Sequence, residues 1–414
     1  MILQSVLGLA AFVAIAWLFS ENRKRVSLRM VLTGLGVQVA LGALLLKIPA
    51  LSRVFVTLNK VVVALEESTT AGAKVVFGYL AGAPLPYEEA IPGSSFILAF
   101  KGLPLILVMS ALSALLFYWK VLPVVVKGFA WALRRTMRIG GAEGVGVAAN
   151  IFVGMVEAPL LVRPYLGRMT RSELFSLMTC GMATVAGTVM VLYASILGDV
   201  IPNALGHILT ASIISAPAAI TISKIMIPET QPPTPAELTT PEEATSSMDA
   251  ITKGTFQGIQ LLFSVVAMII VLVALVHLVN IILGLLPGMG GEAITLQRLL
   301  GYVMAPVMWF MGIPWSESIT AGALMGTKTV LNEFIAYLDL TRLADGALGP
   351  RSRLIVMYAM CGFANPGSLG IMIGGMGAMA TGRRSEIVAL GFRSILAGTI
   401  ATSMTGAVVG IFVR

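Results

Sequence analysis

Charged residues are scarce in this sequence. Only 12% of its 414 residues are Asp, Glu, Lys or Arg, whereas 57% are hydrophobic. Soluble globular domains carry about 25% charged residues, so the composition excludes an ordinary soluble domain and indicates an integral membrane protein. The formal net charge is +8. Because an excess of Lys and Arg is typical of the cytoplasmic loops of membrane proteins, we expect no nucleic-acid partner.

Cysteine and histidine are rarer still. Cys180 and Cys361 are the only cysteines, and both lie in apolar runs, which excludes a disulfide framework and argues against a cysteine metal site. His207 and His277 stand singly, without an HExxH motif or a Ser, His and Asp set. We therefore expect no enzyme and no catalytic residues, and a membrane-embedded enzyme is the less favoured alternative.

Long uncharged runs predict the membrane spans. The first run, 1–20, lacks the basic start and cleavage pattern of a signal peptide, and about 20 residues of helix match the thickness of a bilayer core. We predict it as the first of eight transmembrane helices in an all-α fold. The eight runs are 1–20, 30–46, 102–119, 174–198, 200–223, 254–291, 354–382 and 394–413.

Basic residues predict the orientation of these helices. Arg23, Lys24 and Arg25 follow the first run, and clusters of Lys and Arg in short loops lie on the cytoplasmic side. The N-terminus is therefore predicted outside, and eight spans return the C-terminus to the outside as well.

Two stretches are too polar to span a membrane. Residues 228–248 are acidic and proline-rich, which is typical of a linker, and the span count makes this linker cytoplasmic. Residues 48–100 include Lys60, Glu66 and Lys74. We predict this stretch to be amphipathic or irregular and to lie at the outer interface.

Glu157 and Glu333 each lie within apolar sequence. An ionisable group at membrane depth is expensive unless it faces a wet or protein-lined cavity. The surrounding stretches, 139–162 and 313–340, are too polar or too broken for ordinary spans, and we predict them to be re-entrant hairpins. The alternative is a structural ion pair, with Lys328 as the candidate partner of Glu333.

The sequence contains an internal repeat. Residues 180–187 resemble residues 361–368, and each copy follows one of the two Glu-bearing stretches. The shared order is an amphipathic segment, a hairpin, a helix broken at Cys-Gly, and a further helix. Because the predicted orientation starts the two copies on opposite sides, we predict an inverted repeat, as in many secondary transporters. Carbonyls freed at the breaks are suitable ligands for Na+, although a simple packing kink gives the same pattern.

At these residues the sequence resembles the concentrative nucleoside transporter family. The matching motifs are 150–159 (NIFVGMVEAP), 332–334 (NEF) and 361–365 (CGFAN), in the right order and at compatible separations, and the likeness covers nearly the whole chain. The resemblance implies a homotrimer with eight spanning helices, two hairpins, a scaffold part and a moving transport part. It also implies symport of nucleosides with Na+ or, in some members, H+.

The repeat and this resemblance together divide the chain into five parts. These are scaffold helices with an interfacial segment at 1–119, a first transport repeat at 120–227, the linker at 228–248, a long scaffold helix at 249–291 and a second transport repeat at 292–414.

The resemblance further implies which residues bind the nucleoside. Glu333 suits ribose because a carboxylate accepts hydrogen bonds from two hydroxyls, and Asn365 both donates and accepts. Many family members have Gln where this sequence has Met155, whose thioether cannot donate, so we expect an altered base preference. The implied substrate-binding residues are Met155, Val156, Glu157, Val189 and Leu261 around the base, and Glu333, Phe363, Asn365 and Ser368 around the ribose.

The same resemblance implies a Na+ site. Its ligands would be Asn150, the carbonyl of Val153, Thr184, and the carbonyl of Val185, with Thr184 in place of the usual serine. These features together predict a symporter of the bacterial inner membrane that imports nucleosides with Na+ by alternating access, surrounded by lipid and without an organic cofactor. H+ coupling is the alternative, and a passive channel is disfavoured by the predicted hairpins.

Overall fold

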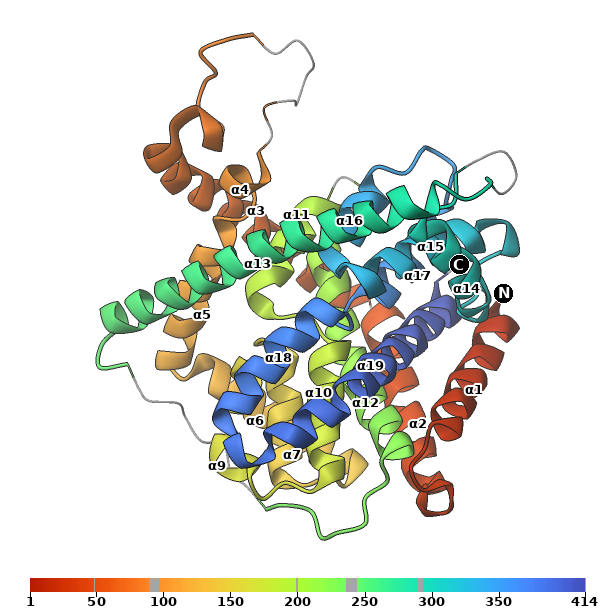
Figure 1. Ribbon diagram of the computed structural model, residues 1–414. Helices are drawn as coiled ribbons and strands as arrows, with labels where there is room; N and C mark the ends of the chain where they lie inside the picture. Colours follow the sequence, from red (N-terminus) through yellow and green to blue (C-terminus); the bar gives the residue numbers. More distant parts are fainter. Residues whose placement is uncertain are drawn as a thin grey trace.

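The computed structural model describes residues 1–47, 49–88, 95, 97–198, 200–235, 244–288 and 293–413. Regular structure in these residues is helical throughout, with no β-strand, which confirms the predicted all-α fold class. The two termini lie close together at one end of the molecule (Figure 1), because α1 (Ile2–Leu18) packs along α19 (Arg384–Phe412).

Six helical segments among the described residues are long and apolar enough to cross a membrane. Two of the eight predicted spans differ from this set: 1–20 forms the 17-residue helix α1, and 354–382 forms two helices, α17 (Pro350–Met360) and α18 (Pro366–Met379). The six segments are α2 (Leu28–Lys47), α4 (Leu98–Lys101) with α5 (Leu105–Tyr118), α10 (Arg171–Ala183) with α11 (Gly187–Leu197), α12 (Ala204–Met226), α13 (Ser247–Leu283), and η3 (Thr381–Arg383) with α19.

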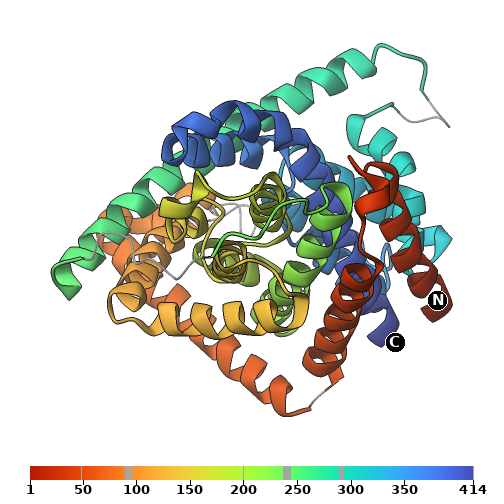
Figure 2. The same ribbon diagram turned by 90° about the horizontal axis from the view of Figure 1, so that it is seen from below.

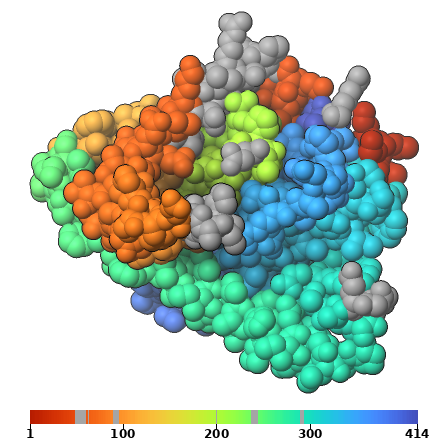
Figure 3. All heavy atoms as spheres, turned by 90° about the horizontal axis from the view of Figure 1, so that it is seen from above, coloured from red at the N-terminus to blue at the C-terminus, as the bar shows by residue number. Residues whose placement is uncertain are grey.

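The stretch predicted to be amphipathic or irregular contains a continuous 29-residue helix, α3 (Pro49–Phe77), followed by η2 (Gly78–Ala81). Lys60, Glu66 and Lys74 are exposed on α3, and residues of this kind lower hydropathy while favouring a helix. Of the two predicted alternatives, the irregular backbone is therefore wrong for this part. Residues 48, 89–94 and 96 lie outside the described residues. Seen from above, η2 and the end of α3 cover part of one face, and α13 runs along one edge (Figure 3).

The helices occur in two sets of the same order. The first set is α6 (Val121–Met137), a hairpin of α7 (Gly141–Asn150), α8 (Glu157–Leu160) and α9 (Arg163–Leu166), the broken helix α10–α11, and α12. The second is α14 (Leu296–Phe310), a hairpin of α15 (Trp315–Val330) and α16 (Glu333–Thr341), the broken helix α17–α18, and α19. The amphipathic helices and hairpins of the two sets lie at opposite ends of the molecule (Figure 1), as expected of an inverted repeat.

Side-chain caps fix where the helices restart in the second set, whereas α8 and α11 of the first set begin without one. Asn332 accepts a hydrogen bond from the backbone of Ile335 at 2.9 Å and so begins α16. Asn365 does the same for Ser368 at 2.8 Å, with Pro366 in the first turn of α18. Asn at this position satisfies a backbone donor that the helix leaves free. The two breaks of the second set are therefore encoded locally and bring polar side chains to the middle of the fold.

The start of the predicted linker is attached to the first hairpin. Thr234 is 7% exposed, and its amide and hydroxyl donate to the Glu173 carboxylate at 2.8 and 2.6 Å. Its carbonyl accepts from the amide of Gly141, the first residue of α7, at 3.0 Å. Thr234 thus joins the beginnings of α7 and α10. Residues 236–243 of the linker lie outside the described residues.

Candidate functional site

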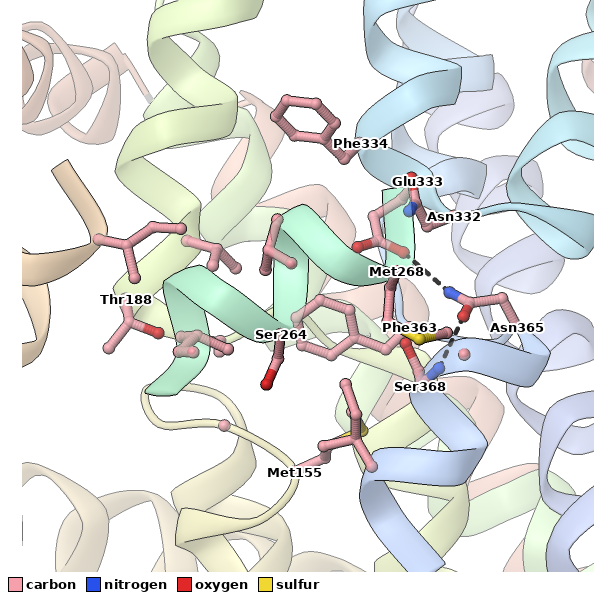
Figure 4. Close-up of a pocket in the computed structure, with 18 of the residues that line it drawn as sticks. Met155, Thr188, Ser264, Met268, Asn332, Glu333, Phe334, Phe363, Asn365 and Ser368 are labelled. Carbon is pink, nitrogen blue, oxygen red and sulfur yellow. Dashed lines mark hydrogen bonds between the residues drawn. The ribbon is translucent and has the colours of Figure 1, made fainter. Parts of the chain in front are cut away.

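A cavity of about 130 Å³ lies between the tips of the two hairpins, the two helix breaks and α13 (Figure 4). The sequence analysis named nine candidate substrate residues from five separate segments of the chain. The structure brings all nine together, since the cavity is lined by Met155, Val156, Glu157, Val189, Leu261, Glu333, Phe363, Asn365 and Ser368.

Glu333 forms the polar centre of the cavity. The residue is 3% exposed. Its carboxylate accepts a hydrogen bond from the hydroxyl of Tyr193 at 2.6 Å and another from Nδ2 of Asn365 at 3.1 Å. The Asn365 side chain is itself held by the amide of Ser368 (Figure 4). A carboxylate has about four acceptor positions, so Glu333 can still accept hydrogen bonds from two hydroxyls of a ligand. The arrangement suits a diol.

The tip of the first hairpin supplies the opposite wall. A side chain at Gly181 would come within 2.9 Å of Met155 Cβ and 3.0 Å of Met372 Cε, so this glycine leaves the space that Met155 fills. Gly181 lies inside α10, and the first break comes only after Ala183, so the predicted break at Cys-Gly holds for the second copy alone. Glu157 is exposed, in contrast to Glu333, and its carboxylate lies against Gly154. The cavity therefore contains one fixed carboxylate and one that remains accessible.

One face of α13 completes the apolar wall. Sequence reasoning identified only Leu261, but Ser264, Val265, Met268 and Leu272 also line the cavity. These positions recur every three to four residues, which places them on one face of a helix. The periodicity starting at Leu261 was the signal that could have identified them.

Tyr193 is the most important residue that the sequence reasoning missed. It lies one helical turn after Val189 on α11, lines the same cavity and contacts the rings of Phe334 and Tyr337. Its place on the Val189 face was the available signal. Its hydroxyl holds one oxygen of Glu333, so Tyr193 orients the carboxylate.

Replacing Tyr193 with Phe should weaken the apparent affinity for substrate about tenfold, because hydrogen bonds to charged groups contribute about 1.5–3 kcal/mol. The measurement is the concentration dependence of uptake. Tyr165→Phe on α9 is a control, since Tyr165 does not line this cavity. Equal affinities for the Tyr193 variant and the original chain would exclude this positioning role.

Lys328 does not form the structural ion pair considered from the sequence. Its side chain is completely buried, yet Nζ has no hydrogen-bond partner among the described residues, and no ion pair joins it to Glu333 there. Glu333 is instead held by the uncharged groups of Tyr193 and Asn365. The carboxylate therefore keeps acceptor positions available to a ligand in the cavity.

The four candidate ion ligands do not line the cavity, although Gly154 and Ala186, which directly follow Val153 and Val185 in the chain, do. Oδ1 of Asn150 is buried without a hydrogen-bond partner in the described part of the chain, while Nδ2 donates to the carbonyl of Gly146 at 3.2 Å. Thr184 donates its proton to the carbonyl of Cys180 at 2.9 Å, which leaves the lone pairs of its hydroxyl oxygen free. An orphaned buried oxygen is costly, and a cation would satisfy it.

Backbone contacts hold the two halves of this candidate ion site together. The amide of Gly187 donates to the carbonyl of Phe152 at 3.1 Å, which joins the first hairpin to the α10–α11 break. Val153 and Val185, whose carbonyls were the other candidate ligands, are 6% and 0% exposed. The site offers oxygen ligands, which suit a hard monovalent cation better than a transition metal.

Comparison with known proteins identifies the family of this chain. Family models described as Na+ dependent nucleoside transporter N-terminus and C-terminus match residues 7–80 and 207–410, and one described as nucleoside recognition matches residues 99–200. A nucleoside permease of Helicobacter pylori, NupC, is 34% identical, with 99% of this chain and 97% of the relative covered. The chain belongs to the concentrative nucleoside transporter family.

Other members of this transporter family match over the whole chain. The uncharacterized transporter YutK of Bacillus subtilis is 37% identical, with both chains fully covered. The solved inward-facing, substrate-bound structure of CNTnw is similar with a TM-score of 0.90 at 36% identity, covering 100% of this chain and 99% of that one. The chain is therefore a multi-pass membrane transporter rather than an enzyme.

Proposed function

We propose that this transporter imports nucleosides in symport with Na+, by alternating access around the cavity between the two hairpins. The observation that carries the proposal is the convergence of nine residues, drawn from both hairpins, both helix breaks and α13, on one cavity. Further support comes from its polarity, which is concentrated at Glu333, Asn365 and Glu157 while the remaining wall is mostly apolar. A nucleoside has the same division into a hydroxylated ribose and a flat base.

Each end of the cavity suits one part of a nucleoside. Glu333 and Asn365 are proposed to bind the ribose hydroxyls, because both present hydrogen-bonding atoms near the α18 break. Met155, Val156 and Phe363 are proposed to enclose the base, with Glu157 hydrogen-bonded to its edge. Leu261 and Val189 complete the apolar walls.

Na+ is the proposed coupling ion, and Asn150, Val153, Thr184 and Val185 are its proposed ligands. The unpartnered Oδ1 of Asn150 supports this choice. Binding of Na+ would fix the tip of the first hairpin against the α10–α11 break and so raise nucleoside affinity, with reciprocal coupling between the two ligands. The exposed carboxylate of Glu157 favours H+ as a second candidate, since an accessible carboxylate can carry a proton.

Uptake of labelled nucleosides into proteoliposomes tests the proposal. An inward Na+ gradient at equal pH should drive accumulation above the external concentration, and an inward proton gradient without Na+ should not. Accumulation driven only by the proton gradient would show that the coupling ion is H+ and not Na+. Equilibration without accumulation under either gradient would indicate a passive channel.

We also propose a homotrimer in the bacterial inner membrane, with both termini outside and with the scaffold and transport parts divided as the repeat suggests. The exposed apolar surface of α13, which includes Phe263, Ile270 and Leu278, supports burial of this helix against lipid or neighbouring copies.

Met155 is proposed to set the base preference. Replacing Met155 with Gln would add an amide donor and acceptor beside the base, and we expect the relative uptake of uridine, cytidine, adenosine and inosine to change by about tenfold for at least one pair. Competition of each nucleoside against labelled uridine measures the ranking. Met155→Leu is the matched control because it changes shape little and adds no polar group. An unchanged ranking in the Gln variant would contradict the role of Met155.

A further inference from the structure

A second cavity, of about 290 Å³, lies at the end of the molecule that carries the α1–α2 turn. Its walls come from the start of α2, the end of α6, the start of α7 and the end of α12. Figure 2 looks onto this end, where α6 approaches α2. This cavity shares no lining residue with the one between the hairpins.

Basic side chains outnumber acidic ones in the lining of this second cavity. Arg25, Arg29 and Arg138 line it together with Lys224, against the two carboxylates of Glu143 and Glu229. Both carboxylates are ion-paired with Lys224, each at 3.1 Å. The carboxylates are thus already neutralised in part by a lysine of the wall, and they leave the three arginines unmatched.

The three guanidinium groups have no ion-pair partner in the described part of the chain. Arg25 belongs to η1 (Arg23–Arg25), Arg29 to the first turn of α2, and Arg138 ends α6. All three are exposed at the cavity. Three positive groups from separate elements repel one another unless an anion lies between them.

The backbone of Arg138 adds an independent observation. Its φ is 55°, which lies in the left-handed region that residues other than Gly, Asn and Asp rarely adopt. Glycine is the usual residue after the end of a helix in this conformation. An arginine here costs backbone energy, and it contributes a guanidinium to the cavity.

We propose that this cavity binds the phosphate group of an anionic ligand, either a phospholipid headgroup or free phosphate. Guanidinium groups match phosphate with paired, charge-assisted hydrogen bonds. The cavity also lies just beyond the ends of α1 and at the start of α2, two apolar helices. That position is the headgroup level of a bilayer, where basic pockets between helices bind anionic lipids.

Thermal unfolding of the purified full chain in non-ionic detergent tests the proposal. Short-chain phosphatidylglycerol and inorganic phosphate are titrated separately, and the rise in the midpoint gives an apparent affinity for each. If only phosphatidylglycerol raises the midpoint, the ligand is a lipid headgroup. If inorganic phosphate raises the midpoint by a similar amount, the ligand is free phosphate.

Two substitutions and one control make the test specific. The double variant Arg25→Ala and Arg29→Ala, and separately Arg138→Gly, should bind the same probe at least about tenfold more weakly. Arg138→Gly should unfold at the same or a higher temperature without ligand, because glycine relieves the positive φ. As a control, Arg135→Ala removes an exposed charge from α6 outside the cavity, and this variant should bind the probe normally. No rise with either probe, or equal affinities in all variants, would overturn the proposal.

Discussion

Replacing Glu333 with Gln should lower nucleoside uptake by at least about a hundredfold. The carboxylate is proposed to accept hydrogen bonds from two ribose hydroxyls, and each bond to a charged acceptor contributes about 1.5–3 kcal/mol. The hydroxyl of Tyr193 and the side-chain amide of Asn365 each donate to one oxygen of Glu333. Glutamine has only one oxygen, so its NH2 group would face one of these two donors. The measurement is initial uptake into proteoliposomes under a saturating Na+ gradient.

Two controls separate this loss from misfolding. Glu67→Gln on α3 makes the same chemical change at an exposed carboxylate and should transport normally. The Glu333 variant should elute from a sizing column as the original chain does. Uptake within threefold of the original chain, with normal elution, would remove Glu333 from the substrate site.

Replacing Thr184 with Val, or Asn150 with Ala, should raise the Na+ concentration for half-maximal uptake by about tenfold or more. Each change removes an oxygen that is proposed to bind the ion, and the loss of one such ligand is comparable to the loss of a hydrogen bond to a charge. Valine has nearly the shape of threonine, so the packing of the break is kept. The measurement is uptake against Na+ concentration, with K+ as the replacement cation.

Thr179 provides a matched control for the threonine change. It lies on α10, just over one turn before Thr184, and its hydroxyl is likewise buried, although unlike that of Thr184 it has no hydrogen-bond partner among the described residues. Thr179→Val should leave the Na+ dependence unchanged. If the Thr179 and Thr184 variants shifted it equally, the effect would be general to α10 and the proposed ion site would be wrong.

The repeat explains why so much of the site could be predicted from the sequence. Polar residues such as Asn332, Glu333 and Asn365 stand out in apolar sequence, and they mark the breaks because asparagine caps the helix that follows. The same residues therefore signal both the local backbone and the chemistry. The nine candidate substrate residues lie together because the two hairpins and breaks face each other, although their functional role stays a proposal.

Other features depend on packing that the sequence does not show. Tyr193 resembles any aromatic residue of an apolar helix until α11 is placed beside Glu333. The sequence left an amphipathic and an irregular backbone open for 48–100, because the charges of α3 lower hydropathy without opposing helix formation. Thr234 lies in a proline-rich stretch that reads as a free linker, and only its contacts with Glu173 and Gly141 show that it is fixed.

The attachment of Thr234 limits how far parts of the transporter can separate. One end of the connection is joined to α7 and α10 through Thr234, and the other end is the capped start of α13 at Ser246. A chain spans at most about 3.3–3.6 Å per residue, so these twelve steps reach roughly 40 Å at full extension. The covalent length of the chain between Thr234 and Ser246 therefore sets an upper limit on how far the first hairpin and the start of α13 can separate while Thr234 keeps its contacts.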